Sequence, residues 1–197
     1  MLYDIAHIIK DKFGFLWEAI ENVNGWLFAC RYGKKLKNVD EVLSPLNGKY
    51  KVRKTAEADV LPLVKFFSEQ PEEAFEFFKP HGFDEKAIKR IVKNKAFQTF
   101  VVEDDRKQIL GYFFLRSFVD GKCFCGRMAD YRARGKGIGK LMAKAIEKVA
   151  VFERLRMYAS ISPDNLASLE SAKAVSDVRI IKTLDNGYYY IERTPKK

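Results

Sequence analysis

The chain has 197 residues, of which 47% are hydrophobic, and a formal net charge of +10 at pH 7. This length and composition suffice for one domain with a full core plus an extension, and no apolar run is long enough to span a membrane. Lysines and arginines are spread through the chain, so we interpret most of them as a solvated basic surface. Nucleic-acid binding is kept as the minority alternative.

The N-terminal part predicts an extension of the domain. Residues 2–22 have apolar positions at helical spacing and predict an amphipathic helix. Gly25 and Gly33 are expected to break the chain around a short apolar piece, and the polar residues 34–48 predict a linker. We place the domain boundary near Gly48. The two predicted parts are residues 1–48 and residues 49–197.

The domain is expected to begin with a strand and three helices. Residues 50–54 alternate as a strand, and helical spacing predicts helices at 57–68 and 71–79, the second rich in aromatic residues. Asp84 is suited to cap a third helix. The apolar positions that this third helix turns inward are Ala87, Ile88, Ile91 and Val92.

Strands dominate the second half of the chain. Aromatic and β-branched residues predict strands at 96–102, 109–118 and 123–130. Apolar residues at helical spacing then predict a helix over 138–152, followed by a strand at 155–161. Ser162-Pro163 has the composition of a helix start, with Ser as the cap and Pro at the first helical position. Residues 178–184 and 188–193 close the chain as a hairpin across a turn that contains glycine.

Cysteines and histidines give no metal site. Cys30, Cys123 and Cys125 are odd in number, and the last two point to the same strand face, where they are poorly placed to bridge each other. With His7 and His81 as the only histidines, no zinc-type cluster forms. No small-residue cleavage site follows the N-terminus, which argues against a signal peptide. We expect a reduced, cytoplasmic protein without a metal and without a membrane partner.

A glycine-rich stretch at residues 134–139 lies where a strand should turn into a helix, a place that can hold phosphates. The P-loop pattern fails, because Leu141 stands where it needs Ser or Thr. The dinucleotide fingerprint also fails, because only Ile138 separates Gly137 from Gly139. The stretch is therefore either an ordinary glycine turn or a different kind of phosphate site.

The pattern that fits is the acyl-CoA signature of the GCN5-related N-acetyltransferases (GNAT), Arg/Gln-x-x-Gly-x-Gly/Ala, matched by Arg134, Gly137 and Gly139. The predicted order β-α-α-β-β-β-α-β-α-β-β over residues 49–197 also resembles this family, as does the segment 165–169 after the fifth strand. The resemblance implies an α/β (α+β) fold. We expect a mixed, mostly antiparallel GNAT sheet flanked by helices, with an N-terminal helical extension.

The resemblance implies an acyl-CoA-dependent N-acetyltransferase. It would transfer the acetyl group of acetyl-CoA to a primary amine, most simply of a small molecule, by direct attack in a ternary complex. One alternative is a CoA-binding regulatory module with little turnover, and another is a basic nucleic-acid- or ribosome-associated protein acetyltransferase. The extension has no readable motif and packs on the domain, forms a homodimer contact or completes the acceptor site.

The family's use of the glycine turn implies the cofactor-binding residues. The pyrophosphate of CoA would rest on backbone N–H groups at the helix start, and a backbone N–H near Met128 would polarise the thioester carbonyl. Asn165 either contacts the pantetheine arm or only satisfies local backbone. The expected cofactor-binding residues are Met128, Arg134, Gly135, Lys136, Gly137, Ile138, Gly139, Lys140 and Asn165.

The catalytic residues are less clear from the pattern. Family members often carry a Tyr seven residues after the Asn, as the acid for the departing thiolate, and here that position is Ala172. Ser171, Tyr158 and water are the substitutes. Asp130 is the first candidate for the general base, with a turn cap as the alternative reading. His81 has a suitable intrinsic pKa and is a weaker candidate, with plain surface as its alternative.

Overall fold

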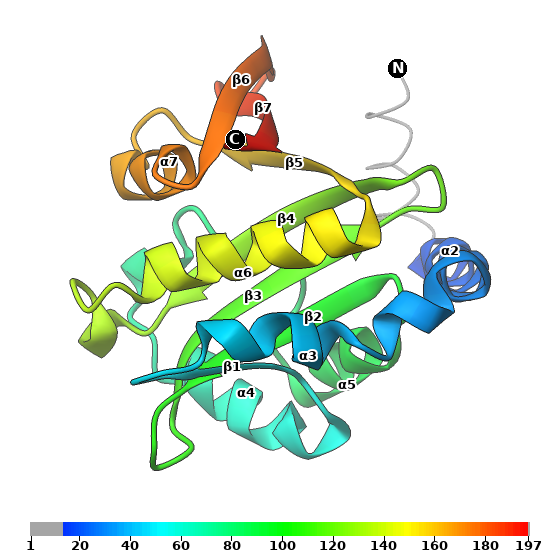
Figure 1. Ribbon diagram of the computed structural model, residues 1–197, viewed down its shortest axis with the longest axis horizontal. Coiled ribbons are helices and arrows are strands. Elements are labelled where there is room, and N and C mark those ends of the chain that lie inside the picture. The colour runs from blue at the N-terminus through cyan, green and yellow to red at the C-terminus, as the bar shows by residue number, and fades with distance from the viewer. Residues whose placement is uncertain (1–13, 197) are drawn as a thin grey trace.

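Seven strands form one sheet in the computed structural model, which describes residues 14–196. The strands are β1 (Lys51–Lys54), β2 (Phe97–Glu103), β3 (Ile109–Ser117), β4 (Lys122–Ala129), β5 (Arg156–Ile161), β6 (Ser176–Thr183) and β7 (Tyr189–Pro195). Their spatial order is β1-β2-β3-β4-β5-β7-β6, as Figure 1 shows. Every neighbouring pair is antiparallel except β4 and β5, which run parallel. The mixed, mostly antiparallel sheet is confirmed.

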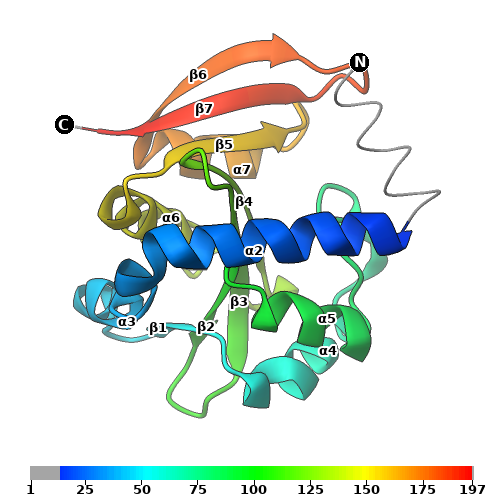
Figure 2. The same ribbon diagram turned by 90° about the vertical axis from the view of Figure 1, so that its right-hand side faces the viewer.

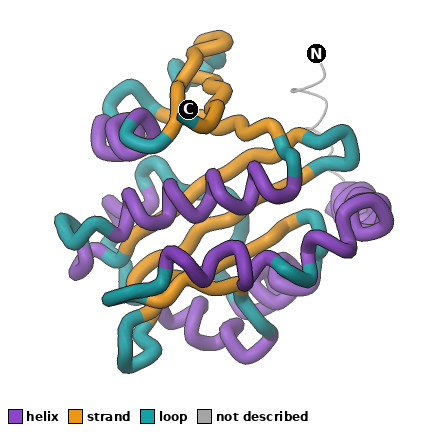
Figure 3. Tube along the Cα trace, in the orientation of Figure 1, coloured by secondary structure: helices purple, strands orange, loops and turns teal. Residues whose placement is uncertain are grey.

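Helices cover both faces of this sheet (Figures 1 and 3). On one face lie α3 (Val39–Leu43) and α6 (Ile138–Glu153), and on the other lie α4 (Val60–Ser68) and α5 (Glu85–Lys93). The side chain of Asp84 caps α5 by accepting a hydrogen bond from the backbone N–H of Ala87, as the sequence predicts. Helix α7 (Leu166–Lys173) packs beside α6 and against β6.

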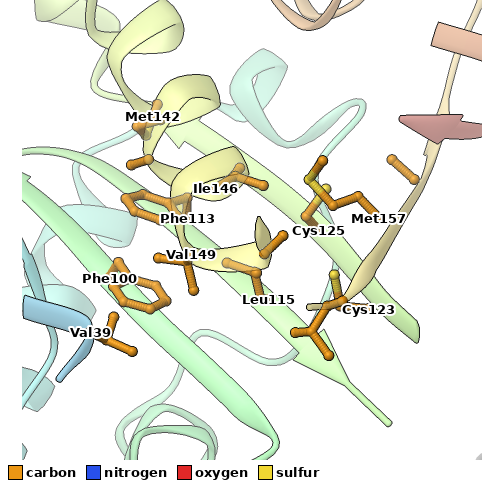
Figure 4. Close-up of a cluster of buried hydrophobic side chains, with 14 of the residues drawn as sticks. Val39, Phe100, Phe113, Leu115, Cys123, Cys125, Met142, Ile146, Val149 and Met157 are labelled. Atoms are coloured by element: carbon orange, nitrogen blue, oxygen red, sulfur yellow. The ribbon is translucent and has the colours of Figure 1, made fainter. Parts of the chain in front are cut away.

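Each face of the sheet has its own hydrophobic core. The larger core lies under α6, where Phe100 and Phe113 stack with ring centroids 4.8 Å apart (Figure 4). Cys123 and Cys125 are buried in the same core and are not bridged. The second core lies under α4 and α5 and is rich in aromatic rings around Tyr112, which is fully buried. Both faces of the sheet are therefore covered by apolar packing.

A single long helix, α2 (Gly14–Leu36), lies across the strand ends (Figure 2). The side chain of Asn24 donates to the carbonyl of Ser117 over 2.9 Å, and that of Arg31 donates to the carbonyl of Val119 over 2.9 Å. The predicted helix over 2–22 is seen from residue 14 onward, and residues 2–13 lie outside the described part. No described helix is long and apolar enough to cross a membrane.

The predicted breaks at Gly25 and Gly33 are wrong, because α2 continues through both. A Cβ at Gly25 would come within 2.8 Å of the side-chain oxygen of Asn94, so this glycine lets α2 approach the end of α5 closely. The predicted linker over 34–48 also differs from the structure, which has the end of α2, α3 and a 3-10 turn η1 (Ser44–Leu46) there. Val39 and Leu43 are buried in the larger core.

Two further local expectations change in the structure. The segment 71–79 contains only the 3-10 turn η3 (Glu72–Phe75), so it is not a full helix. Helix α7 begins at Leu166, not at Ser162-Pro163, and Asn165 caps it by accepting a hydrogen bond from the N–H of Ser168. The remaining 3-10 turns are η2 (Glu57–Asp59) and η4 (Tyr131–Ala133).

Candidate functional site

Strands β4 and β5 are paired at one end only. Their parallel ladder holds three residue pairs and stops at Phe124 and Tyr158. Beyond this pair the strands part, and a cleft of about 710 Å³ lies between them, running from the start of α6 to β5 and α7. The cleft therefore opens where the ladder between β4 and β5 ends.

The glycine turn forms one end of this cleft. Gly135 and Gly137 have φ values of +75° and +80°, in the left-handed region that L side chains rarely adopt. Gly137 is the residue before α6, so the N–H groups of Ile138 and Gly139 have no partner within the helix. A Cβ at Gly139 would meet nothing within 4 Å, so the space above the helix start is open. This arrangement can bind an anion such as a phosphate.

The backbone of β4 presents hydrogen-bond donors to the cleft. The N–H of Asp130 donates to Leu110 over 2.9 Å, which fixes the phase of the β3–β4 ladder. Since antiparallel strands alternate between hydrogen-bonded and non-hydrogen-bonded pairs, the N–H of Met128 also points toward β3. The amides on either side of it, those of Arg127 and Ala129, point toward the cleft. They, and not the amide of Met128, can polarise a carbonyl there.

The far wall of the cleft comes from the segment around η3. Phe77 and Phe78 line it together with two exposed carboxylates, Glu73 and Glu76. An apolar wall with two negative charges attracts a protonated amine. The cleft thus combines an anion site at one end with a wall suited to a cation.

The sequence matches the family model described as "Acetyltransferase (GNAT) family" over residues 63–174, which is more than half of the chain. The chain belongs to this family. It is therefore an N-acetyltransferase, and its glycine turn lies between a strand, β4, and a helix, α6, as the sequence predicts. Among curated proteins, none matches this acetyltransferase at a significant level.

Solved structures share the fold of this acetyltransferase at low sequence identity. The GNAT domain of S. lividans PAT has a TM-score of 0.62 and 14% identity, over 74% of this chain and 90% of that chain. Aminoglycoside acetyltransferase AAC(6')-Ib in complex with coenzyme A and kanamycin has a TM-score of 0.57 and 14% identity, over 74% and 94%. A chimera of spermidine N-acetyltransferase SpeG from Vibrio cholerae and hSSAT has a TM-score of 0.53 and 17% identity, over 74% and 93%.

Most of the predicted cofactor-binding residues line the cleft of the acetyltransferase. Those that do are Met128, Arg134, Gly135, Gly137, Ile138, Gly139 and Asn165. The side chains of Lys136 and Lys140 are exposed beside the turn and do not line it. The side chain of Asn165 caps α7, which is the local backbone role, and the residue also borders the cleft, so its contact with the pantetheine arm stays a prediction.

Asp130 is fully buried and does not line the cleft. Its carboxylate accepts hydrogen bonds from the backbone N–H of Arg132 over 2.7 Å and from the Arg132 guanidinium over 2.8 Å and 3.0 Å. Burial acts to raise the pKa of this carboxyl, but the contacts with Arg132 outweigh it and hold the pKa below its usual value. These contacts are those of a turn cap and make Asp130 a poor proton acceptor.

The two proposed acids lie on different sides of the sheet. Ser171 lines the cleft, and its hydroxyl donates to the carbonyl of Ala167 over 2.8 Å. The hydroxyl of Tyr158 donates to Glu192 over 3.1 Å, and Tyr158 does not line the cleft. Ala172, at the family's usual Tyr position, is fully buried. Of these side chains, Ser171 alone reaches the cleft.

His81 lies in the aromatic core under α4 and α5, away from the cleft lining. Its Nδ1 is 2.7 Å from the carbonyl of Gly82, which can only accept, so Nδ1 carries the proton. Its Nε2 then accepts from the hydroxyl of Tyr112 over 2.9 Å. Burial lowers the pKa of His81 to about 4. The ring is therefore held neutral by contacts within the core.

Some cleft residues carried no recognisable sequence motif. These are Glu73 on η3, Glu76 directly after it, Arg127 on β4 and Arg193 on β7. The two arginines interrupt otherwise apolar inward positions of their strands, since Arg127 follows Cys123 and Cys125, and Arg193 follows Ile191. A charged residue in such an alternation is the signal that could have identified them.

Proposed function

We propose that this acetyltransferase transfers an acetyl group from acetyl-CoA to the primary amine of a small molecule by direct attack in a ternary complex. The observation that carries the proposal is the cleft, which joins the glycine turn at the start of α6 to the unpaired edge of β4. The pyrophosphate of CoA would lie on the N–H groups of residues 134–139, with Arg134 adding positive charge. The pantetheine arm would follow β4 between the parted strands.

In the reaction the neutral amine attacks the thioester carbonyl carbon, the C–N bond forms and the C–S bond breaks. The amides of Arg127 and Ala129 would stabilise the developing oxyanion, because they point into the cleft. The amine loses a proton to solvent or to a carboxylate of the far wall of the cleft, and the thiolate of CoA takes up a proton. Ser171 is the side chain placed to deliver that proton, with water as the alternative.

The class of the acceptor is inferred from the far wall of the cleft, which the segment around η3 forms. Glu73, Glu76, Phe77 and Phe78 favour an amine that is cationic in solution and carries some apolar surface. Two structurally similar proteins, one in complex with kanamycin and one a spermidine N-acetyltransferase, have acceptors with several amines. We further expect the enzyme to act in the cytoplasm.

One observation favours a second candidate, a CoA-binding module with little turnover. Ala172 is fully buried, so the position that carries the acid in many family members contributes nothing to the cleft. Under this alternative the protein binds CoA esters but releases little thiol with any amine.

The test is thermal stability with and without acetyl-CoA and free CoA, in the natural protein and in an Arg134→Glu, Gly137→Glu variant. Stabilisation that the variant loses establishes the cofactor site, and thiol release with a panel of polyamines, amino sugars and aminoglycosides then identifies the acceptor class. No stabilisation at saturating ligand would contradict both candidates. Binding without thiol release across the panel would favour the module.

A further inference from the structure

Two arginine side chains line the cleft near the point where β4 and β5 part. Arg193, from β7, is 2% exposed, and its Nη1 lies 3.7 Å from the sulfur of Cys125, the residue directly after the last paired residue of β4. Arg127 comes two residues later on the same face of β4. Both arginines line the cleft.

All direct partners of these guanidinium groups are neutral. Arg127 donates to the carbonyl of Ser168 over 3.0 Å and to the hydroxyl of Ser171. Arg193 donates to the hydroxyl of Ser176 over 3.1 Å, while its buried Nε has no partner. Within residues 14–196 neither arginine forms a salt bridge.

One acidic group is linked to this pair through a hydroxyl. Glu147 accepts a 3.5 Å hydrogen bond from the hydroxyl of Ser176, which itself accepts from Arg193, so the carboxylate and the guanidinium are not in direct contact. Arg127 has a pKa lowered to about 10, first by burial and then by the positive charge of Arg193. Burying two repelling cations is unfavourable unless an anion joins them. The arrangement therefore lacks one negative group.

We propose that Arg127 and Arg193 form a subsite for a carboxylate at the end of the acyl chain, so that the enzyme also accepts acyl-CoA donors of the dicarboxylic type. The inference rests on the proposed function, since it assumes that CoA lies in this cleft. The phosphates of CoA would lie at the opposite end of the cleft, at the glycine turn that follows β4. The stretch of β4 from Ala129 to Cys125 alone separates the two ends by roughly 13 Å, at 3.3 Å per residue.

The part of the donor that reaches the arginines lies beyond the thioester. In the proposed function the amides of Arg127 and Ala129 would bind the thioester carbonyl, so the acyl chain is the portion that would continue toward Cys125 and the two arginines. A carboxylate there can accept paired N–H donors from a guanidinium, which a methyl group cannot do. The carboxylate takes no part in bond making or breaking.

The experiment compares two CoA esters of equal chain length by calorimetry. Succinyl-CoA and butyryl-CoA both carry a four-carbon acyl group, and only the first ends in a carboxylate. We expect succinyl-CoA to bind at least ten-fold more tightly than butyryl-CoA, and this ratio to fall toward one in Arg127→Met. Arg106→Met, an exposed arginine in the β2–β3 turn, should leave the ratio unchanged.

Several outcomes would overturn the subsite. Equal affinities of the two esters in the natural protein do so directly, and this comparison needs no variant that might not fold. An equal loss of affinity for both esters in Arg127→Met would show that the arginine only connects β4 to α7 by hydrogen bonds. A larger loss of affinity for free CoA than for either ester would show that Arg127 binds the thiolate of CoA and not an acyl carboxylate. If no CoA compound binds, the proposed function itself fails, whereas binding of CoA without a preference for succinyl-CoA removes only the subsite.

Discussion

The carboxylate of Glu153, at the end of α6, accepts a hydrogen bond from the side-chain amide of Gln98 on β2 over 2.7 Å, and both side chains are buried. The other oxygen of each group, Oε1, has no partner. Burial raises the pKa of Glu153 from 4.5 to about 7. The protonated acid gains an O–H donor that the free oxygen of Gln98 can accept, so the neutral form suits this site better than the charged one.

We expect Glu153 to make the folded protein less stable as the pH rises. Between pH 4.5 and about 7 the unfolded chain releases this proton while the folded chain keeps it, so stability is full below this window and reduced above it. The shift corresponds to about 3 kcal/mol at most. Glu153→Gln should remove that loss, which urea unfolding of both proteins at pH 5 and pH 8 will measure. An unchanged pH dependence in the variant would show that Glu153 is ionised when folded.

His81 should remain neutral throughout the physiological range. Its folded pKa of about 4 lies below the ordinary value of 6.5, so its contribution to stability is present above pH 6.5 and is lost as the pH falls toward 4. NMR titration checks this, since His7 is the only other histidine and His81→Asn assigns the signals. A His81 resonance that titrates near pH 6.5 would show that the ring is open to solvent and would restore it as a base candidate.

Substitutions at Gly139 should separate cofactor binding from folding. A Cβ there has no neighbour within 4 Å outside its own helical turn, so we expect Gly139→Val to leave the melting temperature nearly unchanged. The larger side chain would occupy the space above the helix start and should weaken binding of acetyl-CoA at least ten-fold. Gly139→Ala is the matched control and should retain binding, because the family signature accepts Ala at this position. Equal binding by all three proteins would place the pyrophosphate elsewhere.

Asp130→Asn should reduce stability and leave the chemistry intact. The amide oxygen can still cap the turn at Arg132, but the ion pair with its guanidinium is lost, which should cost about 1–3 kcal/mol. We expect the rate at saturating substrates to change less than two-fold and its pH profile to stay the same. A general base in this position would instead lower the rate by about 10²–10⁴-fold, which steady-state kinetics with the identified amine would reveal.

The strands and the glycine turn could be predicted because their signals are local. Strand alternation and glycine turns depend only on neighbouring residues. The helix predicted over 138–152 therefore begins directly after Gly137 in the structure, as expected. The path of α2 could not be predicted in this way. Gly25 weakens an isolated helix, but in the folded chain it contacts Asn94, a residue far along the sequence, and that contact outweighs the local preference.

The candidate site was predictable only where a motif marks it. Arg134, Gly137 and Gly139 stand out by their spacing, and all three line the cleft. Arg127 and Arg193 come from β4 and β7, which lie on either side of β5 in the sheet, so no spacing along the chain indicates that they line the same cleft. The direction of the backbone amides around Met128 likewise depends on the β3–β4 register, which the sequence does not specify.

The three-pair ladder between β4 and β5 leaves the C-terminal strands attached to the rest of the sheet at one end. The free amides of Arg127 and Ala129 are those that a further stretch of β5 would otherwise occupy. A donor lying along β4 would supply acceptors in place of that missing backbone, so the substrate would act as the last segment of the sheet. Hydrogen–deuterium exchange should then be rapid at these two amides in the free enzyme and slow once the cleft is filled.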